Sequence, residues 1–492
     1  MHPLTNPLLL PFGHLLFIVF SLLVYAITTH LTHTRRHPSA AFAWVLLLVL
    51  VPYVGLPAYL LVGLRKYARP LPSPQPRAPA LDAADGNGGH WAMATLDGLR
   101  LGSPRANDAV VLHRDGMHAL RELERVIASA QHTLDVCTYV LGNDAVAHHL
   151  ASLLEQAAAR GVRVRVLIDA AGSWATSRRF LRRLRAAGVA LRRFMPLLHN
   201  PMRGRINLRN HRKLVVADGQ RLWTGGRNLA QEYFFAARGQ PAWIDLTLTI
   251  EGQLAHDAHR LFNASWRRHR GQGSRQRADR KASKAGTPPT VGITRAAGLP
   301  AATTAPEAAP ETARHLAQLV PSGPDLPEDT VLSLLLTGLY QARERVWAVT
   351  PYFVPDDSLL RALRLAALRG VEVTLVIPQR SNHWLADIVR KQPLRDFAAA
   401  GGRILRVDSM MHAKAILIDD SLGLAGSLNL DARSLFLNFE LMVALYSPPD
   451  IAALQQWVET LAADARPYAP RAQASLLRDI GEGLVRWLGF QI

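Results

Sequence analysis

The pattern of apolar and polar positions first sets apart two long stretches near the N-terminus. These stretches, at about residues 8–27 and 40–62, contain no Asp, Glu, Lys or Arg. Each has about 20 residues, which is enough for a helix to span the hydrocarbon core of a bilayer. We therefore expect a two-helix transmembrane hairpin, with the N-terminus and the remainder of the chain on the same side of the membrane.

Two other interpretations of these stretches remain open. The first stretch is also compatible with a cleaved signal peptide, although residues 1–11 lack the Lys and Arg of a basic leader and the apolar core is long. The second is also compatible with a buried core helix, although basic residues flank it at Arg35, Arg36, Arg65 and Lys66. The basic residues after the second stretch favour a cytoplasmic position for the catalytic portion of the chain.

The remainder of the chain contains a pattern that occurs twice, about 200 residues apart. A helical pattern that ends at a glycine and leads into a β-branched run lies at residues 160–168 and again at 369–377. Upstream of these runs, Tyr139 and Tyr352 occupy matching positions. Strands that alternate with helices imply a mixed or largely parallel sheet with helices on both faces. We predict an α/β fold of two duplicated α-β-α sandwich halves that share a central active site.

Shifts in composition mark the boundaries between these parts. A stretch rich in Pro, Ala, Gly and Asp follows the hairpin, and a second polar break, first basic and then rich in Pro, Thr and Ala, separates the halves. The last residues are amphipathic at helical spacing. The predicted parts are a hairpin anchor at 1–70, a tether at 71–108, a first half at 109–269, a flexible linker at 270–314, a second half at 315–470 and a C-terminal amphipathic helix at 471–492.

Composition and charge narrow the class of partner. The 492 residues carry a formal net charge of +19, which favours anionic partners, either nucleic acid or an acidic lipid surface. Charge alone does not choose between them. The single cysteine, Cys137, excludes an intrachain disulfide framework and a Cys-rich zinc site, and its apolar surroundings indicate a buried small side chain. The 19 histidines show no metal-ligand spacing, so we predict neither a metal nor another cofactor.

Two copies of an H-x-K-x4-D motif carry the candidate chemistry. In both copies a Gly-rich turn follows the aspartate at the same distance. One copy alone is also compatible with a surface strand carrying ordinary polar residues, whereas two matched copies in repeated halves favour a functional site. The candidate residues are His211, Lys213, Asp218, Gly226 and Asn228 in the first half, and His412, Lys414, Asp419, Ser427 and Asn429 in the second.

The residue types in these motifs suit transfer of a phosphodiester. Side chains two apart on a strand share a face, so the His and Lys of each motif point into one space if the halves pack with pseudo-two-fold symmetry. Lysine ammonium groups and a glycine-rich turn bind phosphate. One neutral imidazole attacks phosphorus, while the other protonates the departing alkoxide and later deprotonates the incoming alcohol. Asp245 and Glu440, each after its own motif, are candidates to orient the histidines.

The paired motifs resemble the signature of the phospholipase D superfamily. Further stretches, at residues 35–44, 320–325, 350–356 and 429–434, are similar to its bacterial cardiolipin synthase branch. The resemblance implies phospholipase D-like halves behind a two-helix anchor. The first motif departs from the family pattern at one point, because it has Gly226 where the second motif has the hydroxyl of Ser427. The resemblance also implies that His211 is the nucleophile, that His412 is the acid/base, that Lys213, Lys414, Asn228 and Asn429 bind phosphate, and that Asp218 and Asp419 are structural.

The resemblance implies a cardiolipin synthase that joins two phosphatidylglycerol molecules through a phosphohistidine and releases glycerol. Such an enzyme would be a multi-pass protein of the bacterial inner membrane, with anionic phospholipid as its partner and no nucleic acid expected. Three alternatives use the same catalytic residues: a phospholipase D-type hydrolase, a transferase to another alcohol, and a nuclease. A fourth, a non-catalytic membrane scaffold, uses none of them. The sequence leaves the acceptor alcohol and the oligomeric state open.

Overall fold

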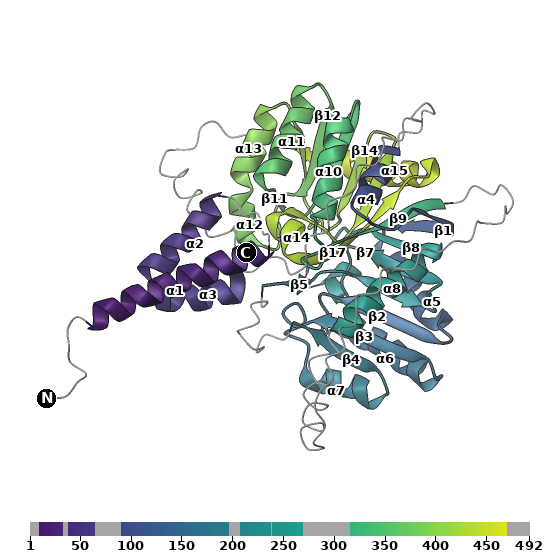
Figure 1. Ribbon diagram of the computed structural model, residues 1–492. Helices are drawn as coiled ribbons and strands as arrows, with labels where there is room; N and C mark the ends of the chain where they lie inside the picture. Colours follow the sequence, from purple (N-terminus) through teal and green to yellow (C-terminus); the bar gives the residue numbers. More distant parts are fainter. Residues whose placement is uncertain are drawn as a thin grey trace, which may run out of the picture.

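The computed structural model describes residues 9–32, 38–63, 90–195, 207–237, 239–268 and 315–469. A mixed sheet runs through two similar halves, with helices on both of its faces (Figure 1). The expected linker and C-terminal amphipathic helix lie outside the described residues, as does the expected tether up to residue 89.

The first half orders its strands β4-β3-β2-β6-β7-β8-β1. β2, β3 and β4 are parallel neighbours, and the remaining strands pair antiparallel. Side chains of Asp115, Asp144 and Ser177 accept backbone N–H groups and so begin three helices. The elements are β1 (Arg105–His113), α5 (Gly116–Ser129), β2 (Thr133–Thr138), α6 (Ala145–Ala159), β3 (Arg163–Asp169), α7 (Arg178–Ala186), β4 (Ala190–Phe194), β5 (Arg209–Asn210), β6 (Leu214–Ala217), β7 (Arg221–Gly225), the 3-10 helix η3 (Gln231–Tyr233), β8 (Thr247–Gly252) and α8 (Gln253–Arg268).

The second half repeats this arrangement with the order β9-β17-β15-β14-β10-β12-β13-β18. Asp356 and Asp431 cap its helices in the same way. The predicted duplication and α/β class are confirmed. The elements are β9 (His315–Ser322), α10 (Thr330–Gln341), β10 (Arg345–Val349), β11 (Phe353–Val354), α11 (Asp357–Leu368), β12 (Glu372–Pro378), α12 (Trp384–Val389), α13 (Lys391–Ala399), β13 (Arg403–Val407), β14 (Ala415–Ile418), β15 (Leu422–Gly426), β16 (Leu430–Asp431), α14 (Ala432–Phe436), β17 (Asn438–Leu445), α15 (Pro448–Ala463) and β18 (Arg466–Pro467).

The halves meet where β1 pairs with β9, so the sheet is continuous. One apolar core, which includes Phe262 of α8 and Leu454 of α15, extends across both halves on one face. On the other face each half has its own core, under α5 to α7 and under α10 to α13. Helix α4 (His90–Gly98), within the range expected as a tether, buries Leu96 in the core of the second half.

The N-terminal apolar sequence forms one long helix and one broken segment. Helix α1 (Leu9–Thr32) contains residues 12–30, which are long and apolar enough to cross a membrane. The second stretch is divided into α2 (Pro38–Leu50), α3 (Pro52–Ala58) and a π-helical turn, η1 (Tyr59–Gly63). The two-helix transmembrane hairpin expected from the sequence is therefore not confirmed.

The break has a local cause in Pro52. Proline lacks the backbone N–H that would continue α2 and clashes with the preceding turn, so a new helix begins there. The chain then turns back on itself. The rings of Trp44 and Tyr59 lie 5.3 Å apart, whereas a straight helix would separate these positions by about 22 Å. Gly55 allows the close approach, since a Cβ there would lie 2.8 Å from the Leu47 carbonyl oxygen.

Contacts with α1 give the direction of each segment. The rings of Phe17 and Tyr53 stack at 4.7 Å, and those of Tyr25 and Tyr59 lie at 5.2 Å. Helix α3 therefore runs in the same direction as α1, and α2 runs opposite to both. Many of the large apolar side chains on this group, including Phe20 and Phe42, are exposed.

Candidate active site

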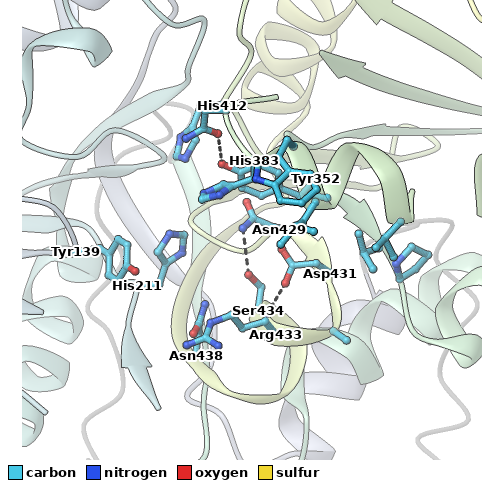
Figure 2. A pocket seen from close by; sticks show the side chains of 18 of the residues that line it. Tyr139, His211, Tyr352, His383, His412, Asn429, Asp431, Arg433, Ser434 and Asn438 are labelled. Atoms are coloured by element: carbon cyan, nitrogen blue, oxygen red, sulfur yellow. Dashed lines mark hydrogen bonds between the residues drawn. The ribbon is translucent and has the colours of Figure 1, made fainter. Parts of the chain in front are cut away.

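A cavity of about 630 Å³ lies between the halves and is lined by both motif histidines, His211 and His412 (Figure 2). The convergence expected from the two motifs is therefore present in the structure. Each histidine and lysine lies just before its strand, because β6 begins at Leu214 and β14 at Ala415. Both histidines are more than nine-tenths buried, so the site is shielded from bulk water.

Backbone hydrogen bonds fix each histidine against the opposite half. The N–H of His211 donates to the Phe439 carbonyl at 2.9 Å, and the N–H of His412 donates to the Ile244 carbonyl at 2.7 Å. Phe439 immediately precedes Glu440, and Ile244 immediately precedes Asp245. The backbone thus brings each histidine beside the carboxylate of the other half.

The two carboxylates pair with the histidines crosswise. His211 Nδ1 lies 2.9 Å from Glu440 Oε1, although Glu440 follows the second motif. His412 Nδ1 lies 2.8 Å from Asp245 Oδ2, although Asp245 follows the first motif. Both carboxylates are fully buried. An Nδ1–H donated to a carboxylate leaves Nε2 as the basic ring nitrogen, which suits both a nucleophile and a proton acceptor.

Burial also sets the charge of the imidazoles. It lowers the pKa of His211 to about 4, against the opposing charge of Glu440. Burial, and then the charge of Lys414, lower the pKa of His412 to about 3. Both rings are thus neutral near pH 7 before substrate binds. A phosphodiester anion beside them favours the protonated form of an imidazole, which a general acid requires.

The two motif lysines occupy equivalent positions. Lys213 Nζ donates to the His211 carbonyl at 2.7 Å, and Lys414 Nζ donates to the His412 carbonyl. Burial lowers the pKa of Lys414 to about 8 and lowers that of Lys213 as well. Two buried ammonium groups of this kind gain from an anion that enters the cavity, because the anion restores the charged form of each.

The motif aspartates lie away from the cavity and hold a turn. The Asp218 carboxylate accepts the backbone N–H groups of residues 131–133, and the Asp419 carboxylate accepts those of residues 343–345. Both residues have left-handed φ angles, of 53° and 47°. Each carboxylate thereby ties the end of its motif strand to the start of the neighbouring strand, β2 or β10.

The Gly-rich turns differ in what they bring to the cavity. Asn228 and Asn429 both line it, and each donates its amide to the hydroxyl five residues later, of Tyr233 and Ser434 respectively. Gly226 and Ser427 are not among the described residues that line the cavity. Their expected contribution to phosphate binding therefore has no direct contact to support it.

Instead, Gly226 and Ser427 lie against the two carboxylates that hold the histidines. The Ser427 hydroxyl donates to Glu440 Oε2 at 2.5 Å. At the matching position a Cβ on Gly226 would lie 2.1 Å from Asp245 Oδ1. The glycine is thus required by the close approach of the carboxylate. The difference between glycine and serine at this position therefore affects the carboxylates that hold the histidines. It does not remove a hydrogen-bond donor from the cavity wall.

The sequence interpretation missed two aromatic residues that hold the imidazoles. The ring of Tyr139 meets His211 edge-on at 5.0 Å, and that of Tyr233 meets His412 edge-on at 5.1 Å. The sequence marks Tyr139 only as a repeated position. The repeated spacing of five residues after Asn228 and Asn429 is the signal that could have identified Tyr233.

The polar groups that line the cavity are nitrogen and oxygen atoms of side chains. Across the ranges that the structure describes, no group of three or more His, Cys, Asp or Glu side chains is placed to hold a metal ion. Two imidazoles and two amides line one cavity, whereas Lys213 and Lys414, each bonded to the carbonyl of its motif histidine, are not among the described residues that line it. These are the groups needed for displacement at a phosphodiester phosphorus.

Comparison with protein families identifies two matching regions. Residues 123–266 and 335–462 match the family described as "Cardiolipin synthase, PLD-like domain", which includes both motifs. Residues 17–63 match the family described as "Phospholipase_D-nuclease N-terminal". The first match alone covers more than half of the chain.

Curated relatives are similar along most of their length. "Cardiolipin synthase A" of Shigella boydii is 31% identical over 458 residues, covering 88% of this chain and 89% of the relative. "Cardiolipin synthase A" of Pseudomonas entomophila is 30% identical and covers 87% of each chain. "Cardiolipin synthase 1" of Bacillus cereus is 28% identical and covers 87% of this chain and 84% of the relative.

A solved structure supports the fold independently. The phosphatidylserine synthase of Haemophilus influenzae superposes with a TM-score of 0.57, at 14% identity, over 81% of this chain and 96% of the other. At this identity the similarity concerns the fold alone.

Proposed function

The chain belongs to the cardiolipin synthase family of phospholipase D-like proteins, and on that premise we propose that it transfers a phosphatidyl group between two phosphatidylglycerol molecules. The products are cardiolipin and glycerol. One observation carries the proposal: a histidine from each half lines the same cavity, and a buried carboxylate holds each of them.

The proposed reaction has two displacements at phosphorus. His211 Nε2 attacks the phosphorus of the donor, and the bond from phosphorus to the glycerol oxygen breaks as His412 gives its proton to that oxygen. The acceptor hydroxyl then gives its proton back to His412, its oxygen bonds to phosphorus, and the bond from phosphorus to His211 breaks. Lys213 and Lys414 stabilise the charge on the phosphoryl oxygens, while Asn228 and Asn429 donate from the sides.

Alternative activities differ in the acceptor. Water in place of the second lipid gives phosphatidic acid, and another alcohol gives another phosphatidyl ester. A nuclease would use the same residues on nucleic acid. Lipid is the better supported substrate, because an apolar helix long enough to cross a membrane precedes the catalytic halves and the curated relatives bear the name cardiolipin synthase.

Product analysis tests the function directly. Purified full-length protein in phosphatidylglycerol micelles is expected to form cardiolipin and glycerol without added divalent metal, as measured by mass spectrometry of the lipids. A preparation with both histidines replaced by alanine controls for contaminating enzymes. Phosphatidic acid as the only product would instead assign a hydrolase, and cleavage of DNA or RNA without lipid turnover would assign a nuclease.

We propose that the protein is a multi-pass protein of the bacterial inner membrane, with the catalytic halves on the cytoplasmic side. The order of the segments suggests a topology other than a simple hairpin. If α1 crosses, α2 returns into the membrane and α3 turns back, then α1 and η1 end on the same side of the membrane. That order puts Arg35, Arg36, Arg65 and Lys66 together on one side, as the positive-inside rule favours.

Cysteine labelling distinguishes the two topologies. In spheroplasts, a membrane-impermeant maleimide is expected to label Thr5→Cys but not Thr34→Cys or Ser73→Cys, and inverted vesicles should reverse the pattern. The native Cys137 is buried, so the unmodified chain serves as the unlabelled control. A simple hairpin predicts that Thr5→Cys and Ser73→Cys behave alike and that Thr34→Cys is opposite, and that result would exclude the broken-helix topology.

A further inference from the structure

The second half contains a helix that the pseudo-symmetry does not explain. Between β3 and β4 of the first half the chain forms the single helix α7. Between the equivalent strands β12 and β13 it forms two, α12 and α13. The additional helix, α12, lies beside the cavity and makes its wall asymmetric, although the two motifs are matched.

The two halves differ in the polarity of the side chains with which they line the cavity. The first half lines the cavity mainly with polar and aromatic groups, including Tyr139, His211 and Asn228. The apolar wall comes almost entirely from the second half. The cavity has a volume of about 630 Å³, which is typical of pockets that enclose a drug-sized molecule. It is larger than a phosphate with a small alcohol requires. The residues of the apolar wall are Val354, Pro355, Leu385, Ala386, Val389 and Pro393.

The second half also supplies two buried amide oxygens. Asn429 Oδ1 and Asn438 Oδ1 have no hydrogen-bond partner among the described residues, and both side chains line the cavity. Figure 2 shows both asparagines among the side chains around the cavity, and they come from the second half, Asn429 just before β16 and Asn438 at the start of β17. Buried polar atoms normally have partners, so two free acceptors here are suited to hydroxyl groups of a ligand.

We propose that the second-half side of the cavity is the subsite of the acceptor lipid, with α12 against its acyl-glycerol part. This inference rests on the proposed function, in which His211 forms the phosphoryl-enzyme and His412 activates the acceptor. The acceptor must therefore approach from the side of His412, and His412 and α12 both belong to the part of the cavity wall that the second half supplies. Its headgroup carries a second hydroxyl besides the attacking one, and Asn429 or Asn438 accepts a hydrogen bond from it.

The subsite has a consequence for the choice between transfer and hydrolysis. A lipid alcohol gains from burying apolar surface against α12, whereas water gains nothing there. The phosphoryl-enzyme is the same in both reactions, since the two acceptors compete for one phosphorus atom. The apolar wall therefore determines the ratio of cardiolipin to phosphatidic acid without changing the first displacement.

Two substitutions on α12 test the assignment. Leu385→Asn and Trp384→Ala are expected to lower the ratio of cardiolipin to phosphatidic acid by about tenfold each, as judged from the apolar contact removed. Leu385 is partly exposed and Trp384 is 69% exposed, so neither change opens the protein core. The ratio is measured by lipid mass spectrometry on full-length protein in phosphatidylglycerol micelles.

Trp174→Ala is the matched control. Trp174 follows β3 as Trp384 follows β12, and it is 78% exposed, but it is not among the residues that line the cavity. The control should keep the ratio of the unmodified enzyme. In all three variants the burst of p-nitrophenolate from a phosphatidyl-p-nitrophenol donor should be unchanged, because that burst reports the first displacement alone.

The outcomes separate this inference from the function on which it rests. A proportional loss of both products, or a smaller burst, would assign α12 to the donor and overturn the acceptor subsite. An equal fall of the ratio in Trp174→Ala would show a general effect of removing an exposed tryptophan and would also overturn it. If the unmodified enzyme makes no cardiolipin, the function itself fails, whatever the variants do.

Discussion

Replacing His211 with alanine is expected to reduce phosphatidyl transfer by about 10⁴-fold or more. The variant lacks the nitrogen that bonds to phosphorus, and in the proposed reaction His412 serves as the acid/base rather than as a second nucleophile. The loss should be equally large with an activated donor such as phosphatidyl-p-nitrophenol, because a better leaving group does not replace a nucleophile. Rates of cardiolipin formation and the burst of p-nitrophenolate measure the two effects.

His412→Ala should show a different defect with the same donor. The nitrophenolate leaves without a proton, so the first displacement proceeds, but the second lacks its base and the phosphoryl-enzyme accumulates. Mass spectrometry of the intact protein detects that adduct. His383→Ala is the control, because His383 also lines the cavity but has no carboxylate partner among its described contacts, and it should stay within about tenfold of the unmodified rate. Accumulation in His211→Ala rather than His412→Ala would reverse the two roles.

Glu440→Gln and Asp245→Asn are expected to reduce transfer by about 10³- to 10⁴-fold each, because an amide can present N–H to Nδ1 and favour the wrong tautomer. Glu440 raises the pKa of His211, so its loss lowers that pKa further. The imidazole is then already neutral at pH 7, and raising the pH should not restore the rate of Glu440→Gln.

The crossed pairing makes these two substitutions distinguishable. Glu440→Gln should resemble His211→Ala and form little adduct with the activated donor. Asp245→Asn should resemble His412→Ala and accumulate the adduct. Asp450→Asn removes a carboxylate that lies 2.8 Å from His315, remote from the cavity, and should leave both steps unaffected. If instead each carboxylate served the histidine of its own half, the two phenotypes would be exchanged.

Much of the catalytic architecture could be predicted because it is local and repeated. The spacing within each motif places His and Lys just before a short strand and Asp just after it, and the second copy indicates a second contribution to one site. The glycines that end α6 and α11, Gly161 and Gly370, have the left-handed φ angles that their position after a helix predicts. These features depend on neighbours in sequence.

The crossed carboxylates could not be predicted in the same way. His211 and Glu440 are 229 positions apart, and the contact is set by backbone pairing between the halves. Nothing near either residue in the sequence encodes that pairing. The role of Ser427 is hidden for the same reason, since a hydroxyl beside a phosphate-binding turn looks like a phosphate ligand until the position of Glu440 is known.

The N-terminal segment departs from its prediction for a different reason. Length and hydropathy of the second apolar stretch predict a straight span. Pro52 and Gly55 in its middle are signals of a break and of a close approach, and they outweigh hydropathy because a helix cannot continue through the missing N–H. Windowed hydropathy averages over such positions and so conceals them.

Each half supplies the carboxylate that holds the histidine of the other half. The single polypeptide therefore has the arrangement of a dimer with two-fold symmetry. Either half on its own would have a histidine without its carboxylate, whereas two copies of one half related by a two-fold axis would complete both pairs at once. Joining such copies in one gene would keep every contact and leave each copy able to diverge, and the helix that follows β12 is one place where the two halves differ.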